Sequence, residues 1–193
     1  MQNIIMKNLE KSTIKYIKGY SDLAHVGDYN LVALNLMTLA NIEVFHHKRN
    51  IYWVDGAVGR FFLKIKGHNC RRLPGRDLLR DFLQTEMMYD IVGSIPEKFE
   101  LKHRVRNHYE LLNYRQGIDS MSLSQLGDVP IICTLPSPLQ EDFAQRLGRG
   151  RILCIGGAMN MLYTEASIPV VIEKLGLEFV WRLRSDTRRR LSR

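Results

Sequence analysis

The sequence predicts an α/β fold, with a Rossmann-like, mostly parallel sheet flanked by helices and a helical, basic C-terminus. Short apolar runs rich in valine, isoleucine and leucine alternate along the chain with longer segments of helical periodicity. Glycine, proline or aspartate follows most of these runs, which is typical of a buried strand that turns into a helix. Hydrophobic residues make up 45% of the 193 residues and charged residues 25%, enough to form a buried core.

The apolar runs predict strands at residues 31–34, 51–54, 88–92, 129–134 and 151–155. Helical periodicity predicts helices at residues 8–17, 37–47, 58–65, 76–85, 96–113, 138–147 and from 169 onward. Residues 120–126 carry no clear pattern. Since single helices separate most of these strands, we expect the strands to be parallel.

We expect three parts: an N-terminal extension at 1–28, an α/β domain at 29–181 and a basic C-terminal segment at 182–193. The last twelve residues hold six arginines and one aspartate, and so carry +5 of the net charge of +8. Such an end favours phosphate groups, as found in nucleic acid, anionic lipid or a substrate diphosphate. Because the remaining residues are nearly balanced in charge, we do not expect a nucleic-acid-binding protein.

Several classes of protein lack their signature here. Cys70, Cys133 and Cys154 are widely spaced, so neither a zinc ribbon nor a disulfide scaffold is expected. The longest uncharged stretch, 29–42, has 14 residues, too few to cross a bilayer, and we expect no secretory signal. The motifs G-x-G-x-x-G, G-x-x-x-x-G-K-[ST], H-E-x-x-H and Asp-x-Asp are absent from the sequence.

Polar residues and glycines follow the expected strands, where open parallel sheets bind their ligands. Asp55 and Gly56 follow strand 51–54, and Asn35 follows strand 31–34. The dipeptide at 55–56 also fits a turn that merely ends its strand.

Two later segments have the same position after a strand. Pro138, Gln140 and Glu141 lie in a proline-stiffened loop and the first helical turn after it, where an acidic residue also stabilises the helix dipole. Gly156 and Gly157 would let backbone N–H groups approach a phosphate, although paired glycines at strand ends are common.

Taken in order, six blocks between residue 31 and about residue 190 resemble the WecG/TagA/CpsF family of bacterial glycosyltransferases (glycosyltransferase family 26). The blocks are Ala33-Leu34-Asn35, Asp55-Gly56, Gly75-Arg76-Asp77-Leu78, Pro138-Leu139-Gln140-Glu141, Gly156-Gly157-Ala158 and Leu-Gly-Leu-Glu-Phe-Val-Trp-Arg-Leu at 175–183. The Pro-x-Gln-Glu block and the last block are the most specific. The chain departs from the family in having Ala33 for a threonine, Asn160 for an aspartate, and a shorter segment between residues 89 and 129.

The resemblance implies inverting transfer of a sugar from a nucleotide donor, usually a uridine diphosphate sugar, to a polyprenyl-diphosphate-linked acceptor, with no metal and no cofactor. It implies that Asp55 is the general base. The substrate-binding residues that it implies are Asn35, Gly56, Gly75, Asp77, Pro138, Gln140, Glu141, Gly156 and Gly157. Without Asp-x-Asp, we expect Arg184, Arg188 and Arg189 to neutralise the diphosphate.

The expected setting is the synthesis of a cell-surface polysaccharide, on the cytoplasmic face of the membrane, with an anionic membrane surface as a partner. The main alternative is a non-catalytic relative that binds a nucleotide sugar or a partner transferase, an interpretation that Ala33 and the shorter middle segment favour.

Overall fold

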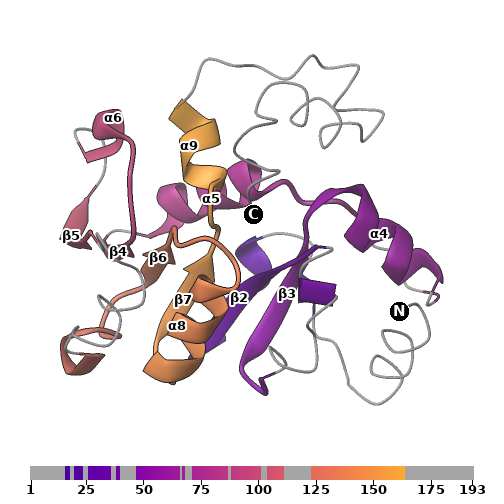
Figure 1. The fold of residues 1–193 in the computed structure, drawn as a ribbon, viewed down its shortest axis with the longest axis horizontal. Coiled ribbons are helices and arrows are strands. Elements are labelled where there is room, and N and C mark those ends of the chain that lie inside the picture. Colours follow the sequence, from indigo (N-terminus) through magenta and orange to yellow (C-terminus); the bar gives the residue numbers. More distant parts are fainter. Residues whose placement is uncertain are drawn as a thin grey trace. The chain divides into compact units, whose positions relative to one another are not determined.

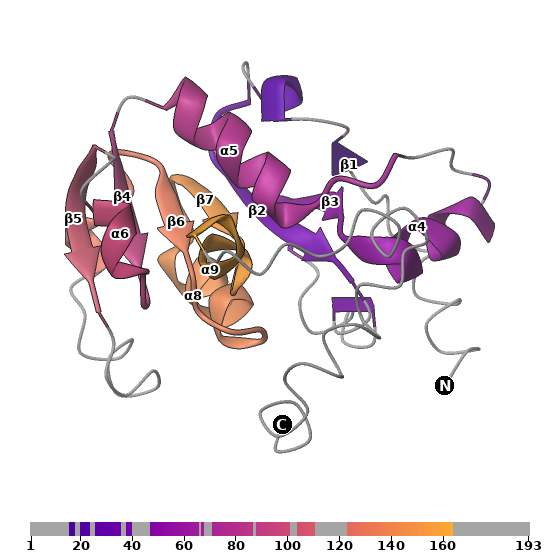
Figure 2. The ribbon, with the colours of Figure 1, turned by 90° about the horizontal axis from the view of Figure 1, so that it is seen from above.

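The computed structural model describes residues 16–17, 20–23, 26–35, 38–39, 47–65, 67, 71–86, 88–100, 104–110 and 123–163. The strands form one seven-stranded, all-parallel sheet in the order β1-β3-β2-β7-β6-β4-β5, flanked by helices (Figures 1 and 2). This arrangement confirms the predicted α/β, Rossmann-like fold.

The strands are β1 (Tyr16–Ile17), β2 (Tyr29–Leu34), β3 (Asn50–Val54), β4 (Tyr89–Val92), β5 (Val105–Tyr109), β6 (Ile131–Cys133) and β7 (Arg151–Cys154). The α-helices are α4 (Gly56–Ile65), α5 (Gly75–Thr85), α6 (Glu97–Glu100), α8 (Leu139–Leu147) and α9 (Ala158–Tyr163). Short 3₁₀ helices lie at η1 (Tyr20–Leu23) and η2 (Leu123–Gln125).

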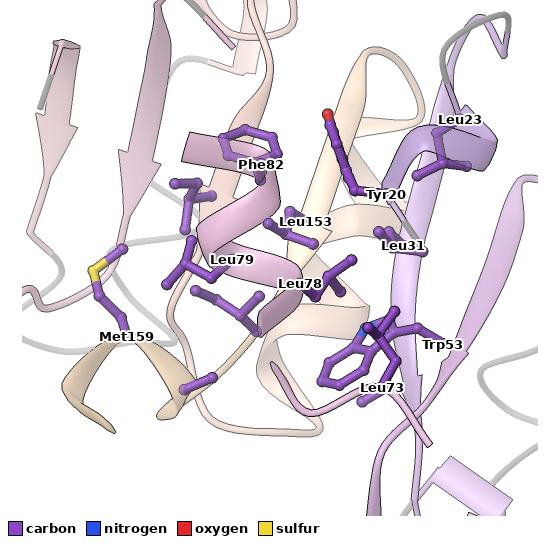
Figure 3. Close-up of a cluster of buried hydrophobic side chains, with 14 of the residues drawn as sticks. Tyr20, Leu23, Leu31, Trp53, Leu73, Leu78, Leu79, Phe82, Leu153 and Met159 are labelled. Atoms are coloured by element: carbon purple, nitrogen blue, oxygen red, sulfur yellow. The ribbon is translucent and has the colours of Figure 1, made fainter. Parts of the chain in front are cut away.

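Hydrophobic side chains cover both faces of the sheet, which explains the unbroken apolar runs in the central strands. In β2, Leu31 and Ala33 belong to the cluster that includes residues of α5 and α9, shown in Figure 3. Val32 and Leu34, which alternate with them, belong to the cluster that includes residues of α8 on the other face. The sheet is therefore a central layer between two helical layers.

The N-terminal part of the chain differs from the expected helix at 8–17. Tyr16 and Ile17 form strand β1, parallel to β3, and residues 8–15 lie outside the described residues. Ile17, Tyr20 and Leu23 are buried in the same cluster as α5. The sheet and its core therefore include residues that precede position 29.

The helix predicted at 96–113 is wrong over residues 104–110. Glu97–Glu100 is helical as predicted, Val105–Tyr109 forms the edge strand β5, parallel to β4, and residues 101–103 and 111–113 lie outside the described residues. Side-chain contacts add to the backbone pairing of this segment with β4: Arg106 and Asn107 bind Asp90, and a ring nitrogen of His108 lies 2.7 Å from the carbonyl oxygen of Gly93. These tertiary contacts outweigh the local helical pattern.

The helices predicted at 58–65, 76–85 and 138–147 are confirmed, with α4 and α5 starting one or two residues earlier. Of the helix predicted at 37–47, Thr38 and Leu39 are helical, residues 37 and 40–46 lie outside the described residues, and His47 is not helical. The predicted C-terminal helix and the basic segment 182–193 also lie outside the described residues.

Candidate functional site

The parallel sheet brings the ends of its strands to one edge, and most of the predicted site residues follow these ends. Asn35 follows β2, half-buried Asp55 follows β3, and Gly156 lies two residues after β7. Gly56 has a φ of 76°, a left-handed conformation in which the chain turns from Asp55 directly into α4. The amino-acid order and the topology therefore agree on a candidate site at this edge.

Asn35 has a structural role as the cap of the helical turn at Thr38. Its Oδ1 accepts a hydrogen bond from the Thr38 N–H at 3.1 Å, and its own N–H donates to Thr38 Oγ1 at 2.9 Å. This reciprocal pair satisfies backbone donors at the start of a helix. The substrate contact predicted for Asn35 stays a prediction.

Gly75 and Asp77 lie in the first turn of α5. The N–H of Leu73 donates to the Val54 carbonyl at 2.9 Å, so the chain enters α5 beside the end of β3. Gly75 is buried, and a Cβ there would lie 2.8 Å from the Trp53 ring. Asp77 pairs with Arg80 at 3.2 Å. Close packing against Trp53 explains the glycine at position 75. The ion pair and the helix dipole explain the aspartate at position 77, so neither residue requires a ligand.

Gln140 and Glu141 form a buried polar pair in the first turn of α8. Oε1 of Glu141 accepts hydrogen bonds from Gln140 Nε2 and from Ser137 Oγ, each at 3.0 Å. Oε1 of Gln140 and Oε2 of Glu141 are buried and have no hydrogen-bond partner. Burial of the carboxyl group raises the pKa of Glu141 above its ordinary value. Because these two acceptors lie on neighbouring residues that follow a strand end, they mark a candidate binding position.

The pair lies against the glycine turn that follows β7. A Cβ on Gly156, whose φ is 50°, would lie 3.7 Å from Gln140 Oε1. The thiol of Cys154 also lies 3.7 Å from the Gln140 carbonyl oxygen, within its reach as a donor. The structure thus brings Gln140, Glu141 and Gly156 together, while Pro138 and Gly157 beside them are exposed.

Thr134 begins the proline-containing run that leads to Gln140 and Glu141, and the sequence predicts no role of its own for it. In the structure it joins the ends of two neighbouring strands. Its Oγ1 donates to the Ser94 carbonyl at 2.8 Å and occupies the space that a Cβ on Gly93 would need. Strands β4 and β6 are neighbours in the sheet, but the strands that follow them in sequence, β5 and β7, lie on opposite sides of this pair. In open parallel sheets, ligands bind in the crevice at such a position, and Thr134 lies there.

Comparison with family models, curated proteins and solved structures finds no match for this chain. The family resemblance of the six blocks therefore rests on the sequence pattern alone. Within the described ranges, no cluster of three or more His, Cys, Asp or Glu side chains could hold a metal ion. In the same ranges, no helix has the length and apolar character needed to cross a membrane.

The predicted base and the buried pair lie at different places along the edge. Asp55 follows β3 and Gln140 follows β6, with β2 and β7 between them. At about 4.8 Å for each step between neighbouring strands, these strand ends are about 14 Å apart. Arg184, Arg188 and Arg189, predicted to bind a diphosphate, lie outside the described residues.

Proposed function

We propose that this chain is an inverting glycosyltransferase that transfers a sugar from a uridine diphosphate donor to a polyprenyl-diphosphate-linked acceptor in bacterial cell-surface polysaccharide synthesis. The observation that carries the proposal is the buried Gln140–Glu141 pair packed against Gly156, at the edge of an all-parallel sheet. Two of the blocks that resemble the family meet there, although about fifteen residues separate them in sequence.

The free acceptor atoms of this pair suit the donor substrate. Gln140 Oε1 and Glu141 Oε2 need hydrogen-bond donors, and the hydroxyl groups of a sugar or ribose and the N–H of a uracil base are such donors. Buried polar groups of this kind discriminate strongly for ligands that complete their hydrogen bonds. Gly157, the residue after Gly156, has open space where a Cβ would lie, and its backbone N–H is proposed to approach a phosphate there.

In the proposed reaction, Asp55 accepts the proton of the acceptor hydroxyl while that oxygen attacks the anomeric carbon. The bond from this carbon to the diphosphate breaks on the opposite face, so the configuration inverts and the nucleoside diphosphate leaves with the electron pair. Arg184, Arg188 and Arg189 are proposed to stabilise its charge.

The test is a transfer assay on the full chain with a panel of uridine diphosphate sugars and a water-soluble diphosphate-linked acceptor, read by mass spectrometry of the products. We expect Asp55→Asn to lower turnover by about 10²–10⁴-fold and to leave donor binding intact. Asp81→Asn, on the exposed side of α5, is the matched control and should turn over like the parent.

Transfer by Asp55→Asn at the parental rate would refute the assignment of the base. Donor binding without transfer by the parent chain, for every acceptor tried, would favour the non-catalytic alternative. Absence of donor binding would contradict both.

A further inference from the structure

Helix α4 carries three rows of side chains, each spaced four residues apart. Gly59 and Leu63 form a buried row, and the missing Cβ of Gly59 lets the helix lie directly against the Leu34 carbonyl at the end of β2. Phe61 and Ile65 form a second row and are 66% and 56% exposed. Because residues four apart share one face of a helix, these two large apolar side chains lie side by side on the surface.

The third row is cationic. Arg60 and Lys64 are exposed and lie beside Phe61 and Ile65 on the helix surface. The surrounding sequence, residues 56–76, contains six lysines and arginines and no aspartate or glutamate, which gives +6 in a chain with a net charge of +8. Outside this segment and the arginine-rich end, the chain is slightly acidic.

Each feature alone is ordinary, because single exposed apolar residues and basic surface residues are common. Their combination on one short helix is not. A helix with adjacent bulky apolar side chains, flanking cations and no acids is typical of helices that lie in a membrane interface. Nucleic acid would satisfy the charges but would leave the aliphatic Ile65 in water.

We propose that α4 docks this protein on an anionic lipid bilayer, with Phe61 and Ile65 entering the boundary between headgroups and acyl chains and with Arg60 and Lys64 contacting lipid phosphates. This inference does not depend on the transferase activity. Membrane docking would nevertheless affect the proposed transfer reaction, because α4 begins immediately after Asp55. A docked α4 would hold the proposed base within a few residues of the surface that carries a lipid-linked acceptor.

The experiment measures partition of the full chain onto vesicles of equal parts phosphatidylcholine and phosphatidylglycerol, and onto vesicles of phosphatidylcholine alone. The apolar variant is Phe61→Ser with Ile65→Ser, and its control is Met88→Ser, another exposed apolar residue at 49%. The charge variant is Arg60→Gln with Lys64→Gln. Its control is Lys98→Gln with Arg104→Gln, on exposed positions of α6 and just before β5, at the opposite end of the sheet from α4 (Figures 1 and 2).

We expect the apolar variant to lose about tenfold or more in partition onto the anionic vesicles. The charge variant should lose roughly 30-fold, from about fivefold for each charge near an anionic surface, and should lose little on phosphatidylcholine. Both controls should stay within about twofold of the parent. All variants should keep the parental melting temperature, since the replaced side chains are exposed.

The arginine-rich C-terminal segment could bind the same lipid, so each variant is also made in a chain that lacks residues 185–193. Loss of binding by the α4 variants in both backgrounds supports the proposal. Unchanged binding by the α4 variants in both backgrounds overturns it.

A second measurement reports insertion itself. Phe61→Trp should gain a blue-shifted emission that brominated acyl chains quench, on anionic vesicles only. Binding of the parent to duplex DNA or RNA that falls in the charge variant but not in the apolar one, without quenching of Phe61→Trp, would overturn the lipid assignment in favour of nucleic acid.

Discussion

Gly75 and Ala158 pack so closely that a Cβ atom on Gly75 would lie 2.9 Å from the Cβ of Ala158. This contact joins the start of α5 to the start of α9, which are 83 positions apart in the sequence. The same Cβ would lie 2.8 Å from the buried ring of Trp53 on β3. Gly75 therefore fixes the approach of two helices on one face of the sheet.

Replacing Gly75 by alanine should destabilise the protein by about 1–3 kcal/mol, because the added methyl group overpacks this contact. Ala158→Gly should recover part of the loss when combined with Gly75→Ala, since it removes one of the two clashing atoms. Urea unfolding of the two single variants and the double variant measures the coupling. Gly157→Ala is the control, because a Cβ there meets nothing within 4 Å. Parental stability of Gly75→Ala would show that this contact relaxes freely.

Asp90 is a fully buried carboxylate whose partners come from the edge strand β5. Arg106 binds it through two hydrogen bonds, Nε to Oδ1 at 3.0 Å and Nη2 to Oδ2 at 2.5 Å, and Asn107 Nδ2 adds a third at 3.2 Å. Arg106→Gln should lower the melting temperature markedly, because it leaves a buried charge without its cation.

The neighbouring Arg104→Gln should change the melting temperature little, because its side chain is exposed. Replacing the pair together, Asp90→Leu with Arg106→Met, should be milder than Arg106→Gln alone, since no buried charge remains. A double variant less stable than the single one would argue against this account.

Gln140 is expected to act on the substrate more than on the fold. Gln140→Ala removes one hydrogen bond to Glu141, worth about 1 kcal/mol, and should weaken nucleotide-sugar binding and transfer at least tenfold. Gln145→Ala, exposed on the same helix, is the matched control. Isothermal titration with uridine diphosphate, beside thermal melting, separates the two effects. A large loss of melting temperature with unchanged binding would make Gln140 a structural residue.

The central strands could be predicted from the sequence because both of their faces are buried. β2, β3, β6 and β7 contain nearly continuous apolar residues. β5 could not be predicted, since an edge strand needs no apolar run and Val105–Tyr109 holds Arg106, Asn107 and His108 for partners on β4. Its contacts are tertiary, and a local pattern contains no information on them.

The same limit applies to the site. The position of Gln140 and Glu141 after a strand could be predicted, but their burial depends on Ser137 and on the Gly156 turn. The role of Gly75 depends on Ala158 and Trp53, far away in sequence, so a glycine that looks like part of a binding motif has a packing reason as well.

The buried carboxyl group of Glu141 predicts a pH-dependent stability. Its pKa in the folded state is raised above the ordinary 4.5, mainly by burial, so the folded protein holds the proton more tightly than the unfolded chain does. The contribution to stability is therefore complete below pH 4.5 and is lost as the pH rises through the raised pKa. Relative to Glu141→Gln, which does not titrate, the free energy of unfolding of the parent should fall across this window.

Two further measurements connect this titration with the proposed site. Ser137→Ala removes a hydrogen bond that lowers the pKa of Glu141, so the window should extend to higher pH. Uridine diphosphate or its sugar should have the opposite effect, because a hydroxyl or N–H donated to Oε2 stabilises the ionised carboxylate and lowers its pKa. Urea unfolding at a series of pH values, with and without the nucleotide, tests both. If the parent and Glu141→Gln share one pH profile, Glu141 has no raised pKa; if only the nucleotide has no effect, its donors do not reach this carboxylate.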